Sequence, residues 1–225
     1  MTGAAPNTAI AMAEHWDQRA DRFDGAASHL RHRPAWRNLF RQALGPGPGM
    51  AVDLGCGTGA CAILLAELGY RVVGVDGSAG MLEYARRAAL DGGHHIEFVN
   101  VGMDRFGLAD RAADAVTLRN VLWTLEDPAA ALRIARGLLA PGGRLLVSDG
   151  IWRDGENDSE ALIGQHLSCF NGVNEEQVRD WFTQTGLEKA RSWHHLFHEN
   201  PYGAMYDCQD GAELIKFFVL TATAV

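Results

Sequence analysis

The sequence predicts an α/β protein with a doubly wound, mostly parallel sheet. Between residues 50 and 150, five β-runs alternate with helical patterns, which favours parallel strands joined by helices. The β-runs are almost continuously apolar, as expected for strands that helices cover on both faces. The first run opens into the glycine-rich stretch "AVDLGCGTG", and in such sheets ligands bind at the carboxyl ends of strands. We therefore expect the binding crevice at this turn.

Two helices are expected ahead of the sheet. The stretches "HWDQRADRFDGA" and "PAWRNLFRQAL" carry apolar residues at helical spacing, and the linker "GPGPG" separates them from the first strand. Within the core, proline near a helix start and glycine after a helix end mark the boundaries. The expected strands are 50–54, 71–76, 96–101, 114–120 and 144–150, and the expected helices are 60–68, 80–90 and 127–139.

The tail has a different pattern. Residues 160–170 repeat apolar positions along one helical face, and "NEEQVRDWFTQTG" predicts a second helix with Asn174 as its N-cap. Two further β-runs, 189–197 and 213–225, suggest a terminal pair whose last strand completes the sheet edge. No internal repeat or low-complexity tract is found, and 225 residues suit one domain with a sizeable core.

Composition narrows the classes of partner. The formal net charge is −8 and the sequence pI is about 5.5, which disfavours nucleic acid and anionic membranes and suits a small molecule. No apolar run is long enough to span a bilayer, and the N-terminus lacks a signal-peptide pattern, so we expect a cytoplasmic protein. The four cysteines have no convincing zinc spacing, and we expect reduced thiols and no metal.

The glycine turn limits the ligand further. Its spacing is G-x-G-x-G, whereas a dinucleotide fold uses G-x-G-x-x-G and a P-loop needs G-K-[ST]. Asp53 stands two residues before Gly55, where a carboxylate would repel phosphate and suit an amine or a sulfonium. Asp76 ends the second strand, roughly 20 residues beyond the turn, which is where an acid accepts hydrogen bonds from a ribose diol.

Several of these stretches resemble one enzyme family. "VDLGCGTG", "GVDGSAGMLEYAR", "DAVTLRNVLWTLEDP" and "LLAPGGRLLVSDG" resemble motifs of the class I S-adenosylmethionine-dependent methyltransferases. "HWDQRADRFD" is similar to the N-terminal helix of their small-molecule branch, and "RNVLWTLEDP" is similar to actinobacterial enzymes that methylate natural products. The resemblance covers roughly residues 14 to 152, and across the tail it is an expectation of fold only.

The resemblance implies a Rossmann-like sheet of seven strands with a reversed edge strand, N-terminal helices and a small acceptor cap. We therefore expect a single methyltransferase domain over 1–225. Its expected parts are a helical lid at 1–44, a cofactor-binding core at 50–150, a cap insertion at 151–172, and a C-terminal helix with edge strands at 173–225.

The resemblance also implies residues that hold S-adenosylmethionine and its product S-adenosylhomocysteine. Asp53 would hold the amino-acid end of the cofactor, and Asp76 would take the ribose hydroxyls. The family usually writes Gly-Asp-Ala after the third strand, but this chain reads "NVGMDRF", so the adenine-binding acid is displaced. The other expected contacts are Gly55, Cys56 and Gly57 at the methionyl and ribose parts, Gly77, Ser78, Met81, Met103 and Asp104 at the adenine, Arg119 and Asn120 near the sulfonium, and Trp16 and Phe23 as a cover.

Methyl transfer is a direct displacement, in which alignment supplies much of the barrier reduction and a general base helps where the acceptor must lose a proton. We expect catalytic groups among His15, His166 and Tyr202. Adjacent His194 and His195 would point to opposite faces of a strand, so at most one would face the pocket. The expected acceptor-binding residues are Trp123, Trp152 and Phe170, from the fourth strand end, the fifth strand end and the cap.

The expected function is methylation of oxygen or nitrogen on a small-molecule acceptor, a bacterial secondary metabolite. Two alternatives stay open: a module that binds S-adenosylmethionine without transferring methyl, and an NAD-dependent oxidoreductase. The glycine spacing and Asp53 count against the oxidoreductase. A macromolecular acceptor is disfavoured by the acidic charge, and the protein is expected to be a monomer or a homodimer.

Overall fold

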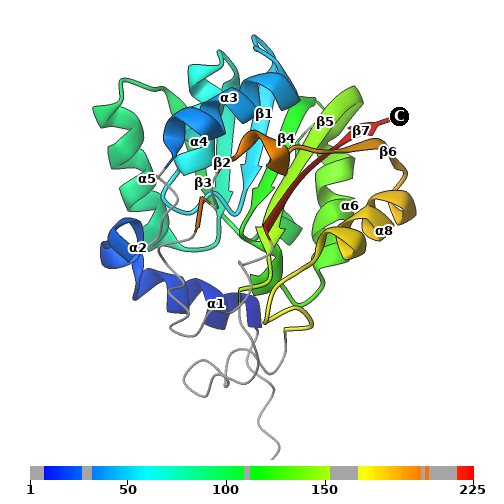
Figure 1. Cartoon of the computed structure of the whole chain (residues 1–225). Helices are drawn as coiled ribbons and strands as arrows, with labels where there is room; N and C mark the ends of the chain where they lie inside the picture. Colours follow the sequence, from blue (N-terminus) through cyan, green and yellow to red (C-terminus); the bar gives the residue numbers. More distant parts are fainter. Residues whose placement is uncertain (1–7, 27–31, 109–111, 153–166, 199–200, 203–216) are drawn as a thin grey trace, which may run out of the picture.

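A seven-stranded sheet forms the centre of the protein, with strand order β3-β2-β1-β4-β5-β7-β6. The computed structural model describes residues 8–26, 32–108, 112–152, 167–198, 201–202 and 217–225 (Figure 1). The strands are β1 Met50–Leu54, β2 Arg71–Asp76, β3 Ile96–Asn100, β4 Ala113–Arg119, β5 Leu139–Gly150, β6 Leu187–Ser192 and β7 Phe217–Ala224. The first five are parallel, as the sequence predicted, and the expected class of fold is confirmed.

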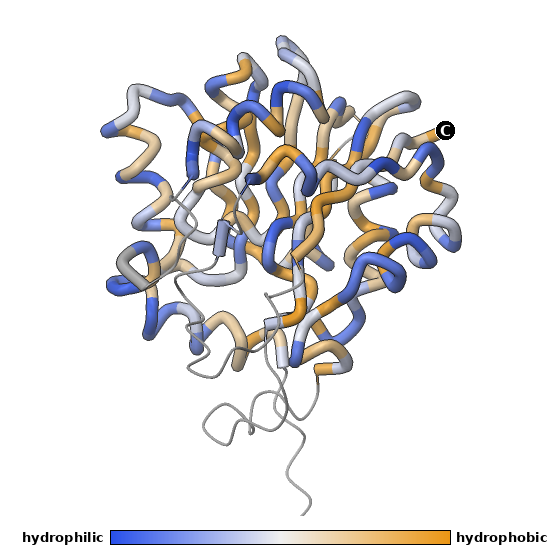
Figure 2. Tube along the Cα trace, in the orientation of Figure 1, coloured by the Kyte–Doolittle hydropathy of each residue, from blue (hydrophilic) through white to orange (hydrophobic). Residues whose placement is uncertain are grey.

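Helices cover both faces of the sheet. On one face α3 (Arg33–Leu44) and α4 (Ala60–Glu67) pack their apolar side chains, and on the other face α6 (Pro128–Leu138) and α8 (Glu175–Gln184) do so. The central strand β1 therefore has buried side chains on both sides, which explains why all of its residues except Asp53 are apolar. Figure 2 shows this arrangement as apolar strands inside a shell of more polar helices.

Two short helices, α1 (Thr8–Asp17) and α2 (Ala20–Ala26), lie below the carboxyl ends of the strands and contact α5 (Ala79–Asp91) (Figure 1). The sequence predicted one helix over residues 15–26, and this was wrong. The chain turns at Gln18 and Arg19, where α1 ends and α2 begins. Because the chain changes direction here, α2 packs against α5 and contacts the glycine turn. A straight continuation of α1 would not follow this path.

The reversed strand and the pairing of the last two strands are confirmed, but the last strand does not complete the sheet edge. β7 is antiparallel to both neighbours and lies between β5 and β6, so the edge is formed by β6 and not by the last strand. The reason is burial, because β7 is buried along most of its length whereas Glu188–Arg191 of β6 are exposed. Lys189 has a φ of 56° at a register shift, which makes the edge irregular and hinders pairing with another chain.

Two expectations for the tail are corrected. The β-run over 189–197 ends at Ser192, because Trp193 turns inward and donates from Nε1 to Oγ1 of Thr221 at 2.8 Å. His194 and His195 then lie in a 3-10 turn and both are exposed, so neither faces the pocket. The helix expected over 160–170 does not extend through 168–170, which form a turn, and residues 153–166 lie outside the described part of the chain.

Candidate active site

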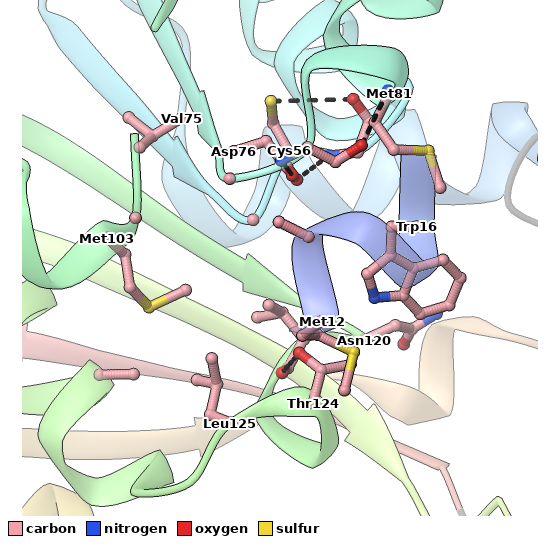
Figure 3. Close-up of a pocket in the computed structure, with 18 of the residues that line it drawn as sticks. Met12, Trp16, Cys56, Val75, Asp76, Met81, Met103, Asn120, Thr124 and Leu125 are labelled. Carbon is pink, nitrogen blue, oxygen red and sulfur yellow. Dashed lines mark hydrogen bonds between the residues drawn. The ribbon is translucent and has the colours of Figure 1, made fainter. Parts of the chain in front are cut away.

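A cavity of about 490 Å³ opens at the carboxyl ends of β1, β2 and β4, with α1 along one side. Figure 3 shows Asp76 and Cys56 at one end, Thr124 and Leu125 at the other, and Met12 and Trp16 of α1 beside them. We name two parts of it by their residues. The glycine-turn half is formed by Asp53, Gly55, Cys56, Gly57, Thr58, Val75, Asp76, Gly77, Ser78 and Met81, and the apolar half by Met12, Trp123, Leu125, Ala130 and Ile134.

Backbone conformation shapes the glycine-turn half. Gly55 has a φ of 68°, and a Cβ at this position would overlap the side chain of Val121. Gly57 has a φ of 52°, and a Cβ there would meet nothing within 4 Å, because it borders open space. The amides of Gly55 and Cys56 both donate to the carbonyl of Val75, at 2.8 and 3.1 Å. The glycines of this turn let a ligand approach the backbone closely.

Asp53 is the buried acid of this half. Its side chain is only 2% exposed, and its Oδ1 accepts a hydrogen bond of 2.6 Å from Oγ1 of Thr117. Its Oδ2 has no hydrogen-bond partner among the described residues. Burial raises the pKa of this carboxyl to about 7, although the Thr117 hydrogen bond acts in the opposite direction. A buried carboxyl with an unused oxygen beside a cavity fits an ammonium group, such as the one on the amino-acid end of S-adenosylmethionine.

Asp76 both braces the turn and borders the cavity. Its Oδ2 accepts from the amide of Gly57 and its Oδ1 from the amide of Ser78, each at 2.8 Å. Burial raises the pKa of this carboxyl, these two hydrogen bonds oppose the rise, and the nearby charge of Asp17 adds to it. Each carboxylate oxygen can accept a second hydrogen bond, so Asp76 keeps capacity for hydroxyl groups of a ligand.

Aromatic rings connect the lid to the apolar half. Trp16 lies edge-on to Phe23 of α2 and to Trp123, with ring centroids 5.6 and 5.9 Å apart. Trp123 in turn lies 6.3 Å from Phe170. Met12 and Leu125 add thioether and aliphatic surface (Figure 3). This half therefore suits an apolar ligand with at least one flat ring.

A buried cation, Arg119, is one of the residues that line the cavity. The guanidinium of Arg119 stacks 4.0 Å from the ring centroid of Trp36, and its Nε donates to the hydroxyl of Tyr202 at 3.1 Å. Tyr202 also packs edge-on against Trp152, at 5.1 Å between ring centroids. These contacts bring residues from β4, α3, the segment after β5 and the tail to one point. They place the Tyr202 hydroxyl, which can donate or accept a proton, beside a fixed positive charge.

Asp149 holds the loops that carry two of the aromatic rings. Its Oδ1 accepts from Nε1 of Trp152 at 2.6 Å, and its Oδ2 accepts from the amide of Leu122 at 3.0 Å. Burial raises the pKa of this carboxyl to about 7 against those hydrogen bonds. Leu122 begins the 3-10 turn that carries Trp123. Asp149 is not among the residues selected from the sequence, although it stands near the end of a predicted strand.

The cavity brings together most of the residues that the sequence selected. Trp123, Trp152 and Tyr202 line it. So do all fourteen expected cofactor-binding residues, which are Asp53, Gly55, Cys56, Gly57, Asp76, Gly77, Ser78, Met81, Met103, Asp104, Arg119, Asn120, Trp16 and Phe23. Phe170 is not a lining residue and packs behind Trp123. His15 does not line the cavity either, and its Nδ1 lies 3.0 Å from Nη1 of Arg19. His166 lies outside the described residues.

Sequence reasoning missed much of the apolar half. Met12 and Ala13 of α1 line the cavity, as do Leu125, Ala130 and Ile134 around the start of α6. Ala130 and Ile134 are four residues apart in a predicted helix. This spacing is the only sequence signal that could have placed both side chains on the same helix face. In the described part of the chain, no group of three His, Cys, Asp or Glu side chains could hold a metal ion. None of the described helices is long and apolar enough to cross a membrane.

Comparisons with known proteins agree with this geometry. A family model described as "Methyltransferase domain" matches residues 52–147. The demethylmenaquinone methyltransferase of Beutenbergia cavernae is 35% identical over 174 residues, 68% of this chain and 68% of that protein. The ubiquinone biosynthesis O-methyltransferase of Ruegeria pomeroyi is 33% identical over 147 residues, 61% of this chain and 59% of that protein.

The fold has solved counterparts. The structure of a geranyl diphosphate methyltransferase in complex with S-adenosylmethionine has a TM-score of 0.64 at 20% identity, and the match covers 85% of each chain. Some curated relatives are matched over about half of their own length, such as 46% and 47%. The family match, the identity to the Beutenbergia protein and the sheet order together show that the chain belongs to the class I S-adenosylmethionine-dependent methyltransferases.

Proposed function

We propose that this protein transfers a methyl group from S-adenosylmethionine to an oxygen or nitrogen atom of an apolar small-molecule acceptor, a bacterial secondary metabolite. The observation that carries the proposal is the division of one cavity into two unlike halves. A buried carboxyl with an unused oxygen lies beside a glycine turn, and thioether, aliphatic and indole side chains form the rest.

The glycine-turn half is proposed to hold the cofactor. Asp53 would bind the ammonium, Asp76 the ribose hydroxyls, and Met81 with Ser78 the region of the adenine. S-adenosylmethionine supplies a methyl group that is already activated on a sulfonium. The residues of the chain then have to orient the acceptor, exclude water and, where the acceptor is protonated, accept its proton.

The apolar half is proposed to hold the acceptor. Trp123, Met12 and Leu125 offer surfaces for a flat ring with apolar substituents. Relatives named for demethylmenaquinone and for ubiquinone biosynthesis support a quinone-like or phenolic acceptor. Of the three proposed catalytic residues, Tyr202 has the most direct support, because it is a lining residue of the cavity and its hydroxyl accepts a hydrogen bond from Arg119. His166 stays a prediction, and His15 would act only indirectly, through Trp16.

We further propose that the chain works as a single domain, as a monomer or homodimer in the cytoplasm, without a nucleic-acid partner. The domain parts would be the lid at 1–44, the core at 50–150, the cap at 151–172 and the tail at 173–225. The acidic net charge of −8 supports a small-molecule partner over nucleic acid.

The first test is a thermal-shift titration with S-adenosylmethionine, S-adenosylhomocysteine, NAD and NADP. A ligand that binds only the folded state raises the melting temperature by mass action. A shift with the sulfur nucleosides alone supports the proposal, and a shift with NAD alone overturns it in favour of the oxidoreductase. Transfer of a radiolabelled methyl group to phenols, quinols or amines then separates an enzyme from a module that only binds the cofactor.

A further inference from the structure

The lid carries the same pair of residue types twice, an aromatic residue followed by aspartate. Trp16 precedes Asp17 at the end of α1, and Phe23 precedes Asp24 in α2. Both aromatic side chains line the cavity. The two carboxylates have another role, because each accepts a hydrogen bond from a residue of the core outside the lid.

Asp17 binds at the start of α5. Its Oδ1 accepts hydrogen bonds from Oγ of Ser78 at 2.6 Å and from the amide of Gly80 at 2.8 Å. A carboxylate at a helix N-terminus is favoured by the helix dipole and by the unpaired amides there. Ser78 lines the cavity and is itself the N-cap of α5, because its Oγ accepts from the amide of Met81. This bond therefore ties the end of α1 to the adenine region.

Asp24 binds the glycine turn. Its Oδ1 accepts a hydrogen bond of 2.7 Å from Oγ1 of Thr58, which is 4% exposed and lines the cavity. Thr58 lies between Gly57 and Gly59, inside the stretch that surrounds the proposed methionyl and ribose contacts. The second bond therefore ties α2 to the glycine turn, which adjoins Ser78 in the same cofactor site, since Asp76 accepts from the amides of both Gly57 and Ser78.

We propose that Asp17 and Asp24 are positioning residues that fix Trp16 and Phe23 over the bound cofactor and slow its release. This inference rests on the proposed function, since it takes the glycine-turn half as the cofactor site. The two anchor points lie in the two turns that line that half, Thr58 in the turn after β1 and Ser78 in the turn after β2. The cofactor leaves only when both hydrogen-bonded anchors give way together.

The same anchors link cofactor binding to the acceptor site. Trp16 is the lid ring that lies against Trp123, so the apolar half is complete only while α1 is held in place. A cofactor that orders Thr58 and Ser78 also orders the hydrogen-bond donors that Asp24 and Asp17 use. The proposal therefore places cofactor binding before acceptor binding.

The test measures the rate at which S-adenosylhomocysteine leaves the full-length protein, by stopped-flow tryptophan fluorescence after displacement with excess S-adenosylmethionine. We expect the Asp17→Ala/Asp24→Ala variant to release it roughly tenfold faster, since hydrogen bonds to charged groups contribute on this scale. Asp24→Asn keeps an oxygen that can accept from Thr58 and should release near the wild-type rate. Asp21→Ala removes an exposed acid of the same helix and is the matched control.

A double-mutant cycle isolates the Asp24 anchor. Thr58→Val removes the donor, so Thr58→Val and Asp24→Ala should each speed release, and the combination should add little to either. Equal melting temperatures of the ligand-free variants separate positioning from loss of fold. Wild-type release from the Asp17→Ala/Asp24→Ala variant overturns the inference, whereas failure of the wild-type protein to bind either sulfur nucleoside overturns the proposed function instead.

Discussion

The two halves of the cavity are built in different ways. The glycine-turn half comes from two strand ends and the turns after them, within residues 53–81, and much of its shape is backbone. The apolar half gathers side chains from α1, the turn after β4 and the first turns of α6. A short motif can encode the first half. The second depends on how distant elements pack, so no short motif encodes the acceptor preference.

The largest expected effect comes from adding a side chain at Gly55 in the glycine-turn half. Gly55→Ala puts a Cβ against the Val121 side chain at a φ of 68°, which adds overpacking to left-handed strain. We expect a loss of about 3 kcal/mol in the free energy of unfolding and no measurable binding of S-adenosylhomocysteine. Denaturant unfolding and calorimetry measure the two effects.

Gly142→Ala is the matched control for Gly55→Ala. Gly142 has a φ of 78°, but a Cβ there meets nothing within 4 Å, and it does not line the cavity. We expect a loss of about 1 kcal/mol from backbone strain with unchanged ligand affinity. Equal effects of the two variants would show that the overlap with Val121 has no consequence.

The next largest effect is expected at Asp76. Asp76→Ala removes the proposed ribose acceptor and also two hydrogen bonds that brace Gly57 and Ser78. Affinity for S-adenosylhomocysteine should fall roughly a hundredfold, since hydrogen bonds to a charged group are strong. Near-native affinity in calorimetry would contradict the proposed role of Asp76.

Trp123→Ala tests the apolar half of the cavity. It removes a wall of the apolar half, so the KM of an acceptor found in the radiolabel screen should rise about tenfold. The affinity for S-adenosylhomocysteine should stay within about twofold, because Trp123 lies outside the glycine-turn half. A tenfold loss of cofactor affinity in this variant would mean that the contact between Trp123 and Trp16 also holds the lid over the cofactor.

The smallest expected effect is a pH dependence at Asp53. Its pKa is raised from 3.8 to about 7, so near pH 7 the ligand-free protein is only partly in the anionic form that an ammonium needs. Affinity for S-adenosylhomocysteine should fall about fourfold from pH 8 to 6.5. The folded state also holds this proton more tightly than the unfolded chain, so the contribution of Asp53 to stability falls as the pH rises from about 4 to 7.

Asp53→Asn should remove the pH trend in affinity and the Asp53 part of the pH trend in stability, because the amide does not titrate. Calorimetry between pH 6 and 8.5 measures the affinity, and thermal unfolding of the ligand-free protein measures the stability. The variant separates Asp53 from Asp149, whose carboxyl pKa is also raised to about 7 by burial. An unchanged affinity profile in Asp53→Asn would assign the proton to another group.

Much of the fold could be predicted because it depends on local patterns. Apolar strands, helix periodicity and boundary residues such as Asn174, which forms the expected N-cap of α8, act over a few neighbours. The failures have non-local causes. The break between α1 and α2 and the place of β7 inside the sheet depend on what each segment packs against. His15 was selected for its residue type, which says nothing about whether its ring faces the cavity.

The sequence by itself determined the doubly wound sheet, the glycine turn and the acids Asp53 and Asp76 at two strand ends. These features are short-range, because strand alternation places the turns at one edge and glycine permits the positive φ values there. Only the tertiary structure decided that Arg119 meets Tyr202, that Asp149 holds Leu122 and Trp152, and that Asp17 and Asp24 reach Ser78 and Thr58. Each of these contacts joins segments that no local pattern relates, and burial and hydrogen-bond geometry select them only once the whole chain has folded.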